Sequence, residues 1–302
     1  MCLRQPGRDE RGAGGVRSGF FGGAEAGLPF AADSEEIVVI LEDFVAKVHF
    51  IGAGPGDPEL ITVKGARLLG EAGVVIYAGS LVDRELVRCH APQAEVYDSA
   101  AMTLEETTAA IAEGILAGQN VVRLHTGDPS IYGAIQEQMV ELDRLGIAYE
   151  VVPGVTSAFA AAAALKQELT LPEVSQTVIL TRLERKTPVP EREALREIAK
   201  IGATLVIYLS VTMIDRVVEE LLQGAYTAET PAAVVYRASW PDEQTLEGTL
   251  ADIAGKVRNA EIGKQALILV GDVLRARQEG LKARSLLYDK EFSHGCRKGI
   301  VT

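Results

Sequence analysis

The chain has 302 residues, a length that favours two domains, and 47% of its residues are hydrophobic, enough to build two apolar cores. The formal net charge of −12 argues against a nucleic-acid-binding protein, which would need a basic surface. No apolar run reaches the roughly 18 residues that a membrane span needs, so we expect no membrane association. The three cysteines form no Cys-x-x-Cys pair, which excludes a cysteine zinc site and makes the cytoplasm the expected location.

Residues 1–45 differ from the rest of the chain. They are rich in glycine, carry scattered arginine and show no hydrophobic periodicity. Such a composition predicts a flexible extension. The segment also has no apolar core of the kind that a secretory signal contains, so we do not interpret it as one.

The segment that follows alternates between strand-like and helical patterns. A capping-box pair, Thr103 and Glu106, predicts the start of one helix, and Gly118 is a suitable C-terminal stop for it. Alternation of this kind predicts a mainly parallel sheet covered by helices, in a first domain over residues 46–155. The expected strands are 48–51, 74–77, 121–124 and 148–152, and the expected helices are 64–71, 104–117 and 131–145.

Three loops of small residues follow three of these strands. They are Gly52-Ala53-Gly54-Pro55-Gly56-Asp57, Thr126-Gly127-Asp128-Pro129 and Pro153-Gly154-Val155-Thr156-Ser157. Ligands of parallel α/β sheets bind outside the carboxyl ends of the strands, so the three loops are expected to line one site. A dinucleotide site is not expected there, because Asp57 stands where that fingerprint needs its third glycine and the strand 74–77 is followed by no acidic residue.

A second domain is predicted over residues 156–276, and a helix at 155–165 is expected to join it to the first. This domain has fewer helices for its number of strands than the first, which indicates a mixed sheet. A polar tail follows at 277–302. The fold class is therefore two α/β domains with a cleft between them. The expected strands are 177–181, 204–209, 232–236, 246–250 and 266–270, and the expected helices are 191–200, 214–223 and 253–260.

The order and spacing of the three loops resemble the signature of the tetrapyrrole methylases, over residues 47–275. Three further segments resemble the subgroup that methylates C11 of precorrin-4 or cobalt-precorrin-4. One departure is that no glycine precedes the basic residues of the loop 183–186. The segments are Tyr77–Val82, Thr181-Arg182 with Thr187–Pro190, and Tyr236–Glu243.

The resemblance implies a cytoplasmic homodimer that transfers a methyl group from S-adenosylmethionine to a tetrapyrrole in cobalamin biosynthesis. It implies no catalytic side chain and no metal site of the protein, since any cobalt would arrive inside the substrate. Uroporphyrinogen-III, C20 and C17 methyltransferases of the same family are the alternatives. The residues expected to bind the donor are Pro55, Thr126, Gly127, Asp128, Ile131, Thr156, Ser157, Leu209, Ala238, Ala266 and Leu267.

The macrocycle carries many carboxylates, so cations and aromatic rings near the cleft are candidates for its binding. The expected contacts are Gly54, His125, Tyr132, Arg182 and Arg237, with Arg123, Arg185, Lys186 and Trp240 as further candidates. His49 is also expected to flank the cleft. Because Asp128 is assigned to the donor, the substitution Asp128→Ala is expected to weaken donor binding and to leave the thermal unfolding midpoint nearly unchanged.

Overall fold

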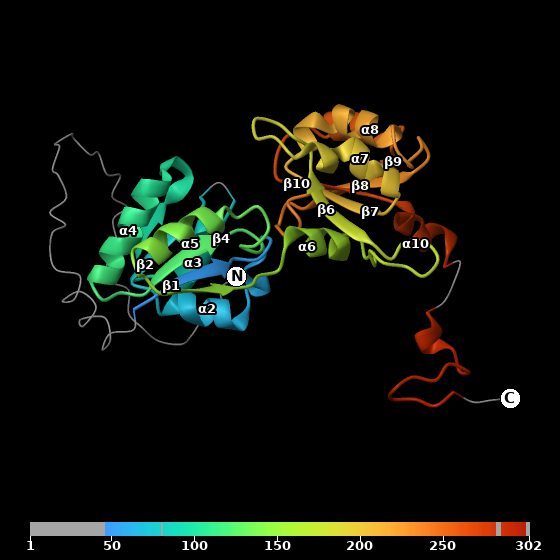
Figure 1. The fold of residues 1–302 in the computed structure, drawn as a ribbon. Helices are drawn as coiled ribbons and strands as arrows, with labels where there is room; N and C mark the ends of the chain where they lie inside the picture. Colours follow the sequence, from blue (N-terminus) through green and yellow to red (C-terminus); the bar gives the residue numbers. More distant parts are fainter. Residues whose placement is uncertain (1–45, 80, 282–284, 300–302) are drawn as a thin grey trace. The chain divides into compact units, whose positions relative to one another are not determined.

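The computed structural model describes residues 46–79, 81–281 and 285–299, and the chain divides into two compact units, Met1–Thr156 and Ser157–Thr302 (Figure 1). The predicted flexible extension at 1–45 lies outside the described residues, as do the last residues of the polar tail. None of the described helices is both long and apolar enough to cross a membrane.

Unit 1 is a five-stranded sheet in the order β3-β2-β4-β1-β5, and every neighbouring pair of strands is parallel, which confirms the predicted parallel sheet. All carboxyl ends of its strands therefore meet at one edge. The strands are β1 (Val48–Gly52), β2 (Val74–Tyr77), β3 (Glu95–Asp98), β4 (Val121–His125) and β5 (Tyr149–Val152), and the helices are α2 (Val63–Gly70), α3 (Arg84–His90), α4 (Leu104–Leu116) and α5 (Ile135–Arg144).

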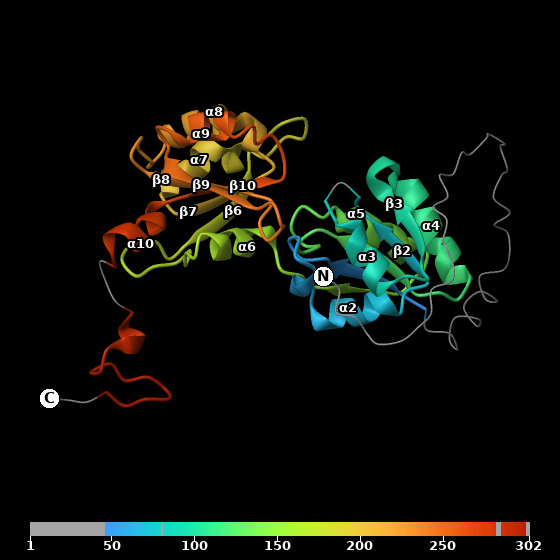
Figure 2. The same ribbon diagram turned by 180° about the vertical axis from the view of Figure 1, so that it is seen from behind.

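Helices cover both faces of this sheet because its central strands are apolar on both sides. In β1, Ile51 belongs to the core formed with α2 and α3, while Phe50 belongs to the core formed with α4 and α5. A strand alternates its side chains between faces, so five consecutive buried residues require a layer on each side. Figures 1 and 2 show α2 on one side of the strands and α4 with α5 on the other.

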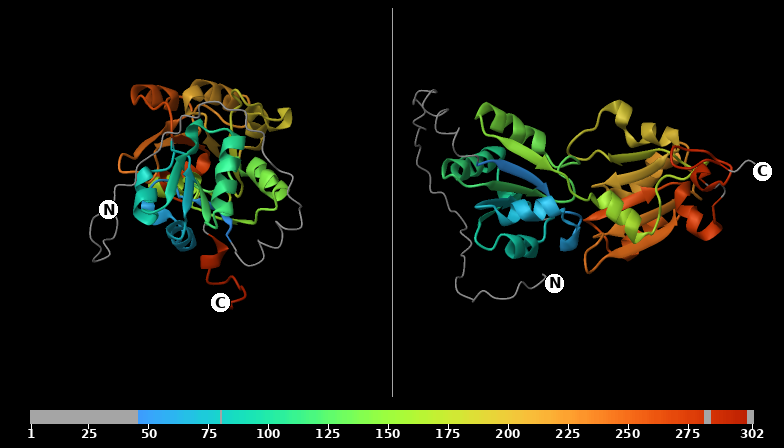
Figure 3. Two further views of the ribbon diagram at one scale, coloured as in Figure 1. Left: turned by 90° about the vertical axis from the view of Figure 1, so that its left-hand side faces the viewer. Right: turned by 90° about the horizontal axis from the view of Figure 1, so that it is seen from below.

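Unit 2 is a mixed sheet in the order β6-β7-β10-β8-β9, with β6 parallel to β7 and the other pairs antiparallel, as predicted. Its main core packs under α7, α8 and α9, and α6 lies on the opposite face (Figures 1 and 2). The right-hand view of Figure 3 shows the strands of each sheet side by side. The strands are β6 (Val178–Arg182), β7 (Thr204–Tyr208), β8 (Pro231–Tyr236), β9 (Gln244–Thr249) and β10 (Ala266–Val270), and the helices are α6 (Ser157–Ala164), α7 (Leu195–Ile198), α8 (Ile214–Leu222), α9 (Ile253–Asn259) and α10 (Ala276–Glu279).

The predicted ends of α4 are confirmed. The Thr103 hydroxyl accepts from the Glu106 backbone N–H while the Glu106 carboxylate accepts from the Thr103 N–H, which completes the capping box. At the other end Gly118 has a φ of +71° and donates to the Ile115 carbonyl at 2.9 Å. This left-handed residue closes the helix, and glycine adopts it without a steric cost.

Two predicted helices were wrong in extent. Helix α5 begins at Ile135 and not at 131, because Tyr132 and Ala134 adopt left-handed φ values of 55° and 49°. The expected helix at 191–200 is divided into the 3-10 turn Glu191–Glu193, α7, and the 3-10 turn Ala199–Ile201. Helix α3, strand β3 and the short helix α10 were not predicted from the sequence.

Candidate functional site

The carboxyl edge of the sheet in unit 1 is closed by backbone contacts between the loops after β1 and β4. Gly54 and Gly127 form an isolated antiparallel bridge, in which the Gly127 N–H donates to the Gly54 carbonyl at 2.8 Å. The Ala53 N–H donates to the His125 carbonyl at 2.7 Å. Pairing therefore continues beyond both strands, and the two loops are held as one piece of main chain.

The loop after β5 joins them through glycine. A Cβ atom added to Gly52 would lie 2.5 Å from the Gly127 oxygen and 2.6 Å from the Gly154 Cα, and one added to Gly154 would lie 2.8 Å from the Gly52 Cα. Real side chains do not approach so closely. Gly52 and Gly154 therefore let the three loops touch each other.

Asp128 links two of the same loops by its side chain. Its Oδ1 accepts from the Ser130 backbone N–H at 2.8 Å and its Oδ2 accepts from the Gly154 backbone N–H at 2.9 Å. Each carboxylate oxygen therefore has a structural partner, and charge-assisted bonds of this type are strong. The expectation that Asp128→Ala leaves stability nearly unchanged conflicts with this geometry, since the change removes both contacts.

His125 ends β4 at this edge, and it is 5% exposed. Its Nε2 atom is buried and has no hydrogen-bond partner among the described residues, and its ring lies 6.0 Å from that of Phe50. Burial, with a smaller contribution from the Arg123 charge, lowers the pKa of His125 to about 3. The imidazole is therefore neutral at physiological pH.

Arg123 lies two residues earlier on the same face of β4. Its guanidinium donates to the Gln138 amide oxygen and to the Ile76 carbonyl, both at 3.1 Å, and burial lowers its pKa to about 10. The expected role of Arg123 as a substrate cation does not fit these buried contacts. Gln138, which holds it, was not predicted, because nothing in the sequence distinguishes this residue from the exposed glutamines of a helix.

The other residues expected at this edge lie near it in different environments. Pro55, Gly54 and Thr156 are buried, Thr126 and Ile131 are half-buried, and Tyr132 is 47% exposed. Tyr132 belongs to the left-handed turn before α5, in which a Cβ on Gly133 would overlap the Pro129 carbonyl. Ser157 begins α6 and therefore belongs to unit 2.

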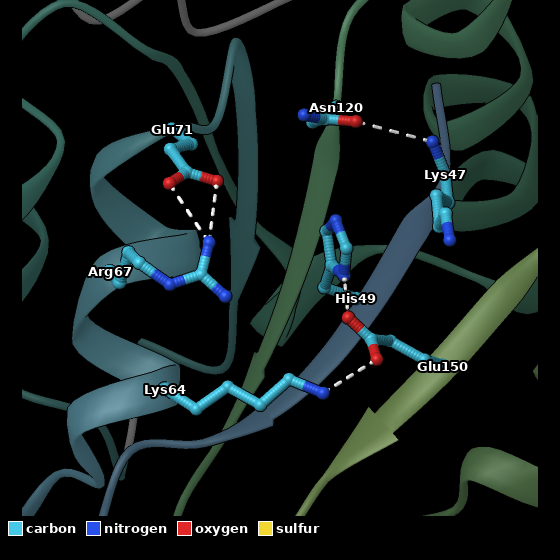
Figure 4. A network of polar contacts seen from close by, with 7 residues as sticks. All are labelled: Lys47, His49, Lys64, Arg67, Glu71, Asn120 and Glu150. Carbon is cyan, nitrogen blue, oxygen red and sulfur yellow. Dashed lines mark hydrogen bonds and ion pairs between the residues drawn. The ribbon is translucent and has the colours of Figure 1, made fainter. Parts of the chain in front are cut away.

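His49 does not lie at this edge. It is the second residue of β1, and its Nδ1 is 2.8 Å from the Glu150 carboxylate on the neighbouring strand β5 (Figure 4). Lys64 of α2 contacts the other oxygen of Glu150 at 2.7 Å. The expectation that His49 flanks the site was wrong, because the register places it with its ion-pair partner toward the amino end of the strands.

In unit 2 the predicted donor residues also gather at one edge of the sheet. Leu209 follows β7, Ala238 lies just after β8, and Ala266 and Leu267 begin β10, which runs antiparallel to both of those strands. Leu209 is 62% exposed and has a φ of 53°, and Gln265, next to Ala266, has a φ of 50°. Left-handed backbone in residues other than glycine is strained, and such strain concentrates at functional sites.

Arg237 is engaged within its own loop. Its guanidinium carbon lies 4.2 Å from the centre of the Trp240 ring, and its Nη1 donates to the Asp242 carboxylate at 2.6 Å. Its Nε atom is buried and has no partner among the described residues. Trp240, expected to stack on a macrocycle, therefore has one ring face next to a guanidinium.

Arg182 ends β6 at the same edge, opposite Tyr208 of β7. Its guanidinium donates to the Thr187 carbonyl at 3.1 Å and to the Pro188 carbonyl at 2.9 Å. The side chain expected to bind substrate therefore holds the loop that follows its own strand.

The two edges suit an organic ligand that is bound by backbone and small side chains. In unit 1 the edge offers loop backbone and a buried, neutral imidazole whose Nε2 has no hydrogen-bond partner within the described part of the chain. In unit 2 an exposed leucine stands beside small, buried alanines. Neither set resembles a nucleophile with its base, so binding and positioning are what these residues supply.

Comparison with known proteins agrees with this chemistry. The family model for tetrapyrrole (corrin/porphyrin) methylases matches residues 47–254. The cobalt-precorrin-4 C(11)-methyltransferase of Methanocaldococcus jannaschii is 57% identical over 252 residues, which cover 83% of this chain and 96% of that protein.

Solved structures give the same result. The fold is similar to that of a cobalamin biosynthetic enzyme, cobalt precorrin-4 methyltransferase, with a TM-score of 0.74 and 51% identity over 76% of this chain and 95% of that one. It is also similar to the uroporphyrin-III C-methyltransferase of Thermus thermophilus complexed with S-adenosylhomocysteine, with a TM-score of 0.65 and 33% identity over 76% and 94% of the chains. The chain belongs to the tetrapyrrole methylases.

Proposed function

We propose that the chain transfers a methyl group from S-adenosylmethionine to C11 of precorrin-4 or cobalt-precorrin-4, a step of cobalamin biosynthesis. One observation carries the proposal. The chain is 57% identical to a relative named for this reaction, over 83% of this chain and 96% of the relative. The two strand edges support it, because both offer close-fitting backbone and small side chains and neither offers a covalent catalyst.

The residues of both edges fit the donor. In unit 1 these are Pro55, Thr126, Gly127, Asp128, Ile131 and Thr156, and in unit 2 they are Ser157, Leu209, Ala238, Ala266 and Leu267. Leu209 exposes apolar surface suited to a purine ring. The loops of unit 1 present main-chain groups to the polar parts, and the Asp128 carboxylate contributes negative charge beside them while it holds the Gly154 N–H.

When bound, the donor supplies an electrophilic methyl group on a sulfonium. The chain contributes alignment: an electron-rich ring carbon forms the new bond while the carbon–sulfur bond breaks, and the two must stay in line. Positioning of this kind supplies up to about 7–11 kcal/mol of the barrier. The bridged loops suit the task because the Gly54–Gly127 contact fixes one with respect to the other.

Substrate recognition uses the remaining candidates, with Arg182 acting through the loop that it holds. Gly54, His125 and Tyr132 belong to the edge of unit 1, and Arg182 and Arg237 to that of unit 2. The neutral His125 imidazole is suited to hydrogen bonding and carries no charge at pH 7.

The test is a methylation assay with metal-free precorrin-4, cobalt-precorrin-4 and uroporphyrinogen-III as separate substrates. We expect a methyl group at C11 of one or both precorrins. Product from uroporphyrinogen-III alone, or from a C20 or C17 acceptor alone, would refute the assignment. The comparison of the two precorrins also determines whether cobalt is inserted before this step.

Donor binding and assembly have separate tests. Calorimetric titration with S-adenosylhomocysteine should give micromolar or tighter affinity, and no measurable heat would contradict the donor assignment. Sedimentation equilibrium should give a homodimer, as the family resemblance implies.

A further inference from the structure

The loop after β6 carries two cations, Arg185 and Lys186, that pair with no acidic residue in the described part of the chain. This cationic loop, residues 183–188, leaves the edge of unit 2 that also holds Leu209 and Ala266. Arg185 and Lys186 are exposed at its tip, and neither has an ion-pair partner among the described residues. Residues 182–188 carry the cations Arg182, Arg185 and Lys186 and the single acid Glu184, in a chain of net charge −12.

Arg182 holds the shape of this loop. Its guanidinium donates to the carbonyls of Thr187 and Pro188, and the Arg185 N–H donates to the Thr187 carbonyl at 3.3 Å. A planar guanidinium with several donors can bind two carbonyls at once, which an ammonium group does less well. These bonds hold the far end of the loop, at Thr187 and Pro188, against Arg182, the last residue of β6.

The root of the loop is fixed in the core. Leu183 is 3% exposed, and its N–H donates to the Ser210 hydroxyl at 2.9 Å. None of the residues 183–187 adopts a left-handed φ. The glycine expected in this loop is therefore not needed for its conformation.

The one acidic residue of the loop is neutralised from the side. Glu184 is 2.7 Å from the guanidinium of Arg216 on α8, and Arg216 also contacts Glu220 at 3.5 Å. The Glu184 carboxylate therefore pairs with Arg216 on α8 and not with Arg185 or Lys186, which follow it in sequence. The two cations at the tip are thus left available for an anionic ligand.

We propose that the cationic loop binds carboxylate side chains of the tetrapyrrole, with Arg185 and Lys186 as the contacts and Arg182 as a positioning residue. This inference deepens the proposed function and rests on it for the identity of the substrate. Electrostatic attraction of this type is sensitive to salt and acts on an acidic substrate.

The first experiment compares the wild type with Arg185→Gln/Lys186→Gln. The KM for the precorrin should rise about five- to tenfold, as expected for two exposed ion pairs, and its dependence on salt should weaken. The affinity for S-adenosylhomocysteine and kcat should be unchanged. The matched control, Lys290→Gln/Lys298→Gln, removes two exposed cations elsewhere and should leave KM unaltered. An unchanged KM in the first variant would overturn the proposal.

The second experiment separates position from charge. Arg182→Lys keeps the charge but loses the two-carbonyl contact, so trypsin should cut after Arg185 and Lys186 sooner and KM should rise about threefold or more. Faster cleavage with an unchanged KM would reduce Arg182 to a structural role.

A third measurement separates the loop proposal from the proposed function. If the wild type methylates no precorrin, the proposed function fails, but titration with uroporphyrin, an acidic porphyrin, still tests the loop. Weaker uroporphyrin binding by Arg185→Gln/Lys186→Gln than by the wild type supports the proposal, and equal binding refutes it.

Discussion

The two units build their strand-end edges in different ways. In unit 1, glycines bring main chain against main chain, and the Gly54–Gly127 bridge joins two loops. In unit 2, left-handed conformations are adopted by residues with side chains, among them Leu209, Arg237 and Gln265. At the first edge a Cβ on Gly52 or Gly154 has no space, while side chains such as Arg182 and Arg237 hold the loops of the second. The two should therefore respond oppositely to changes at glycine and non-glycine positions.

The largest effect is expected for Gly154→Ala. Its Cβ would overlap backbone atoms of Gly52 and Gly127, which cannot move without separating the loops, so the free energy of unfolding should fall by about 3 kcal/mol or more. Urea denaturation measures it. The control is Gly255→Ala in α9, where a Cβ meets nothing within 4 Å; helix propensity should make it neutral or stabilising by up to about 1 kcal/mol. Equal effects would refute the tight contact.

Asp128→Ala should come next. It leaves the N–H groups of Ser130 and Gly154 without their acceptor and should cost about 2–3 kcal/mol of stability, together with weaker donor binding. Asp128→Asn retains one acceptor oxygen and should cost about half as much. Unfolding curves of both variants, with and without S-adenosylhomocysteine, provide the measurement. A stable Asp128→Ala protein would show that the carboxylate does not link the loops.

A pH effect follows from His125. Its folded pKa of about 3 lies below the ordinary 6.5, so between these values the unfolded chain binds more protons and stability rises with pH. The contribution is complete above pH 6.5 and is lost as the pH falls, by about 1.4 kcal/mol per unit. Between pH 7 and pH 5 the wild type should therefore lose about 2 kcal/mol more than His125→Gln. If the wild type and His125→Gln lost the same stability, the His125 imidazole would be exposed to water and not buried.

The smallest effect on stability is expected for Leu209→Gly in unit 2. Relief of the left-handed backbone offsets the greater entropy of glycine in the unfolded chain, so stability should change by less than about 1 kcal/mol. Donor affinity should fall about tenfold, since a leucine surface is removed. Lys166→Gly, at a φ of 52° after α6, is the control and should not alter donor affinity. A large loss of stability would remove the contrast between the units.

The sequence predicted the parts of the fold that have strong local patterns. Strands such as β2 and β10 are continuous apolar runs, and their bounds were predicted as the structure has them. The missed helix α3 buries only Leu86 and Val87, and the missed strand β3 is an edge strand with exposed ends, so neither has a clear hydrophobic period.

The candidate site was predicted less completely. The three loops were located correctly, because small residues after parallel strands point to one edge. The contacts of Asp128, Arg182 and Arg237 were not predicted, since each depends on backbone groups or neighbours that become close only in three dimensions. The left-handed turn at Tyr132 and Ala134 was not predicted, because a helical pattern covers these residues.

The Gly54–Gly127 bridge has a consequence for how this enzyme can be altered. Since two loops share one pair of backbone hydrogen bonds, a substitution that shifts either loop displaces the other as well. Libraries that diversify residues 52–57 or 126–129 should consist mostly of unfolded members. A change of acceptor by laboratory evolution is expected to arise in side chains of unit 2, in the loops at 183–188 and 237–243.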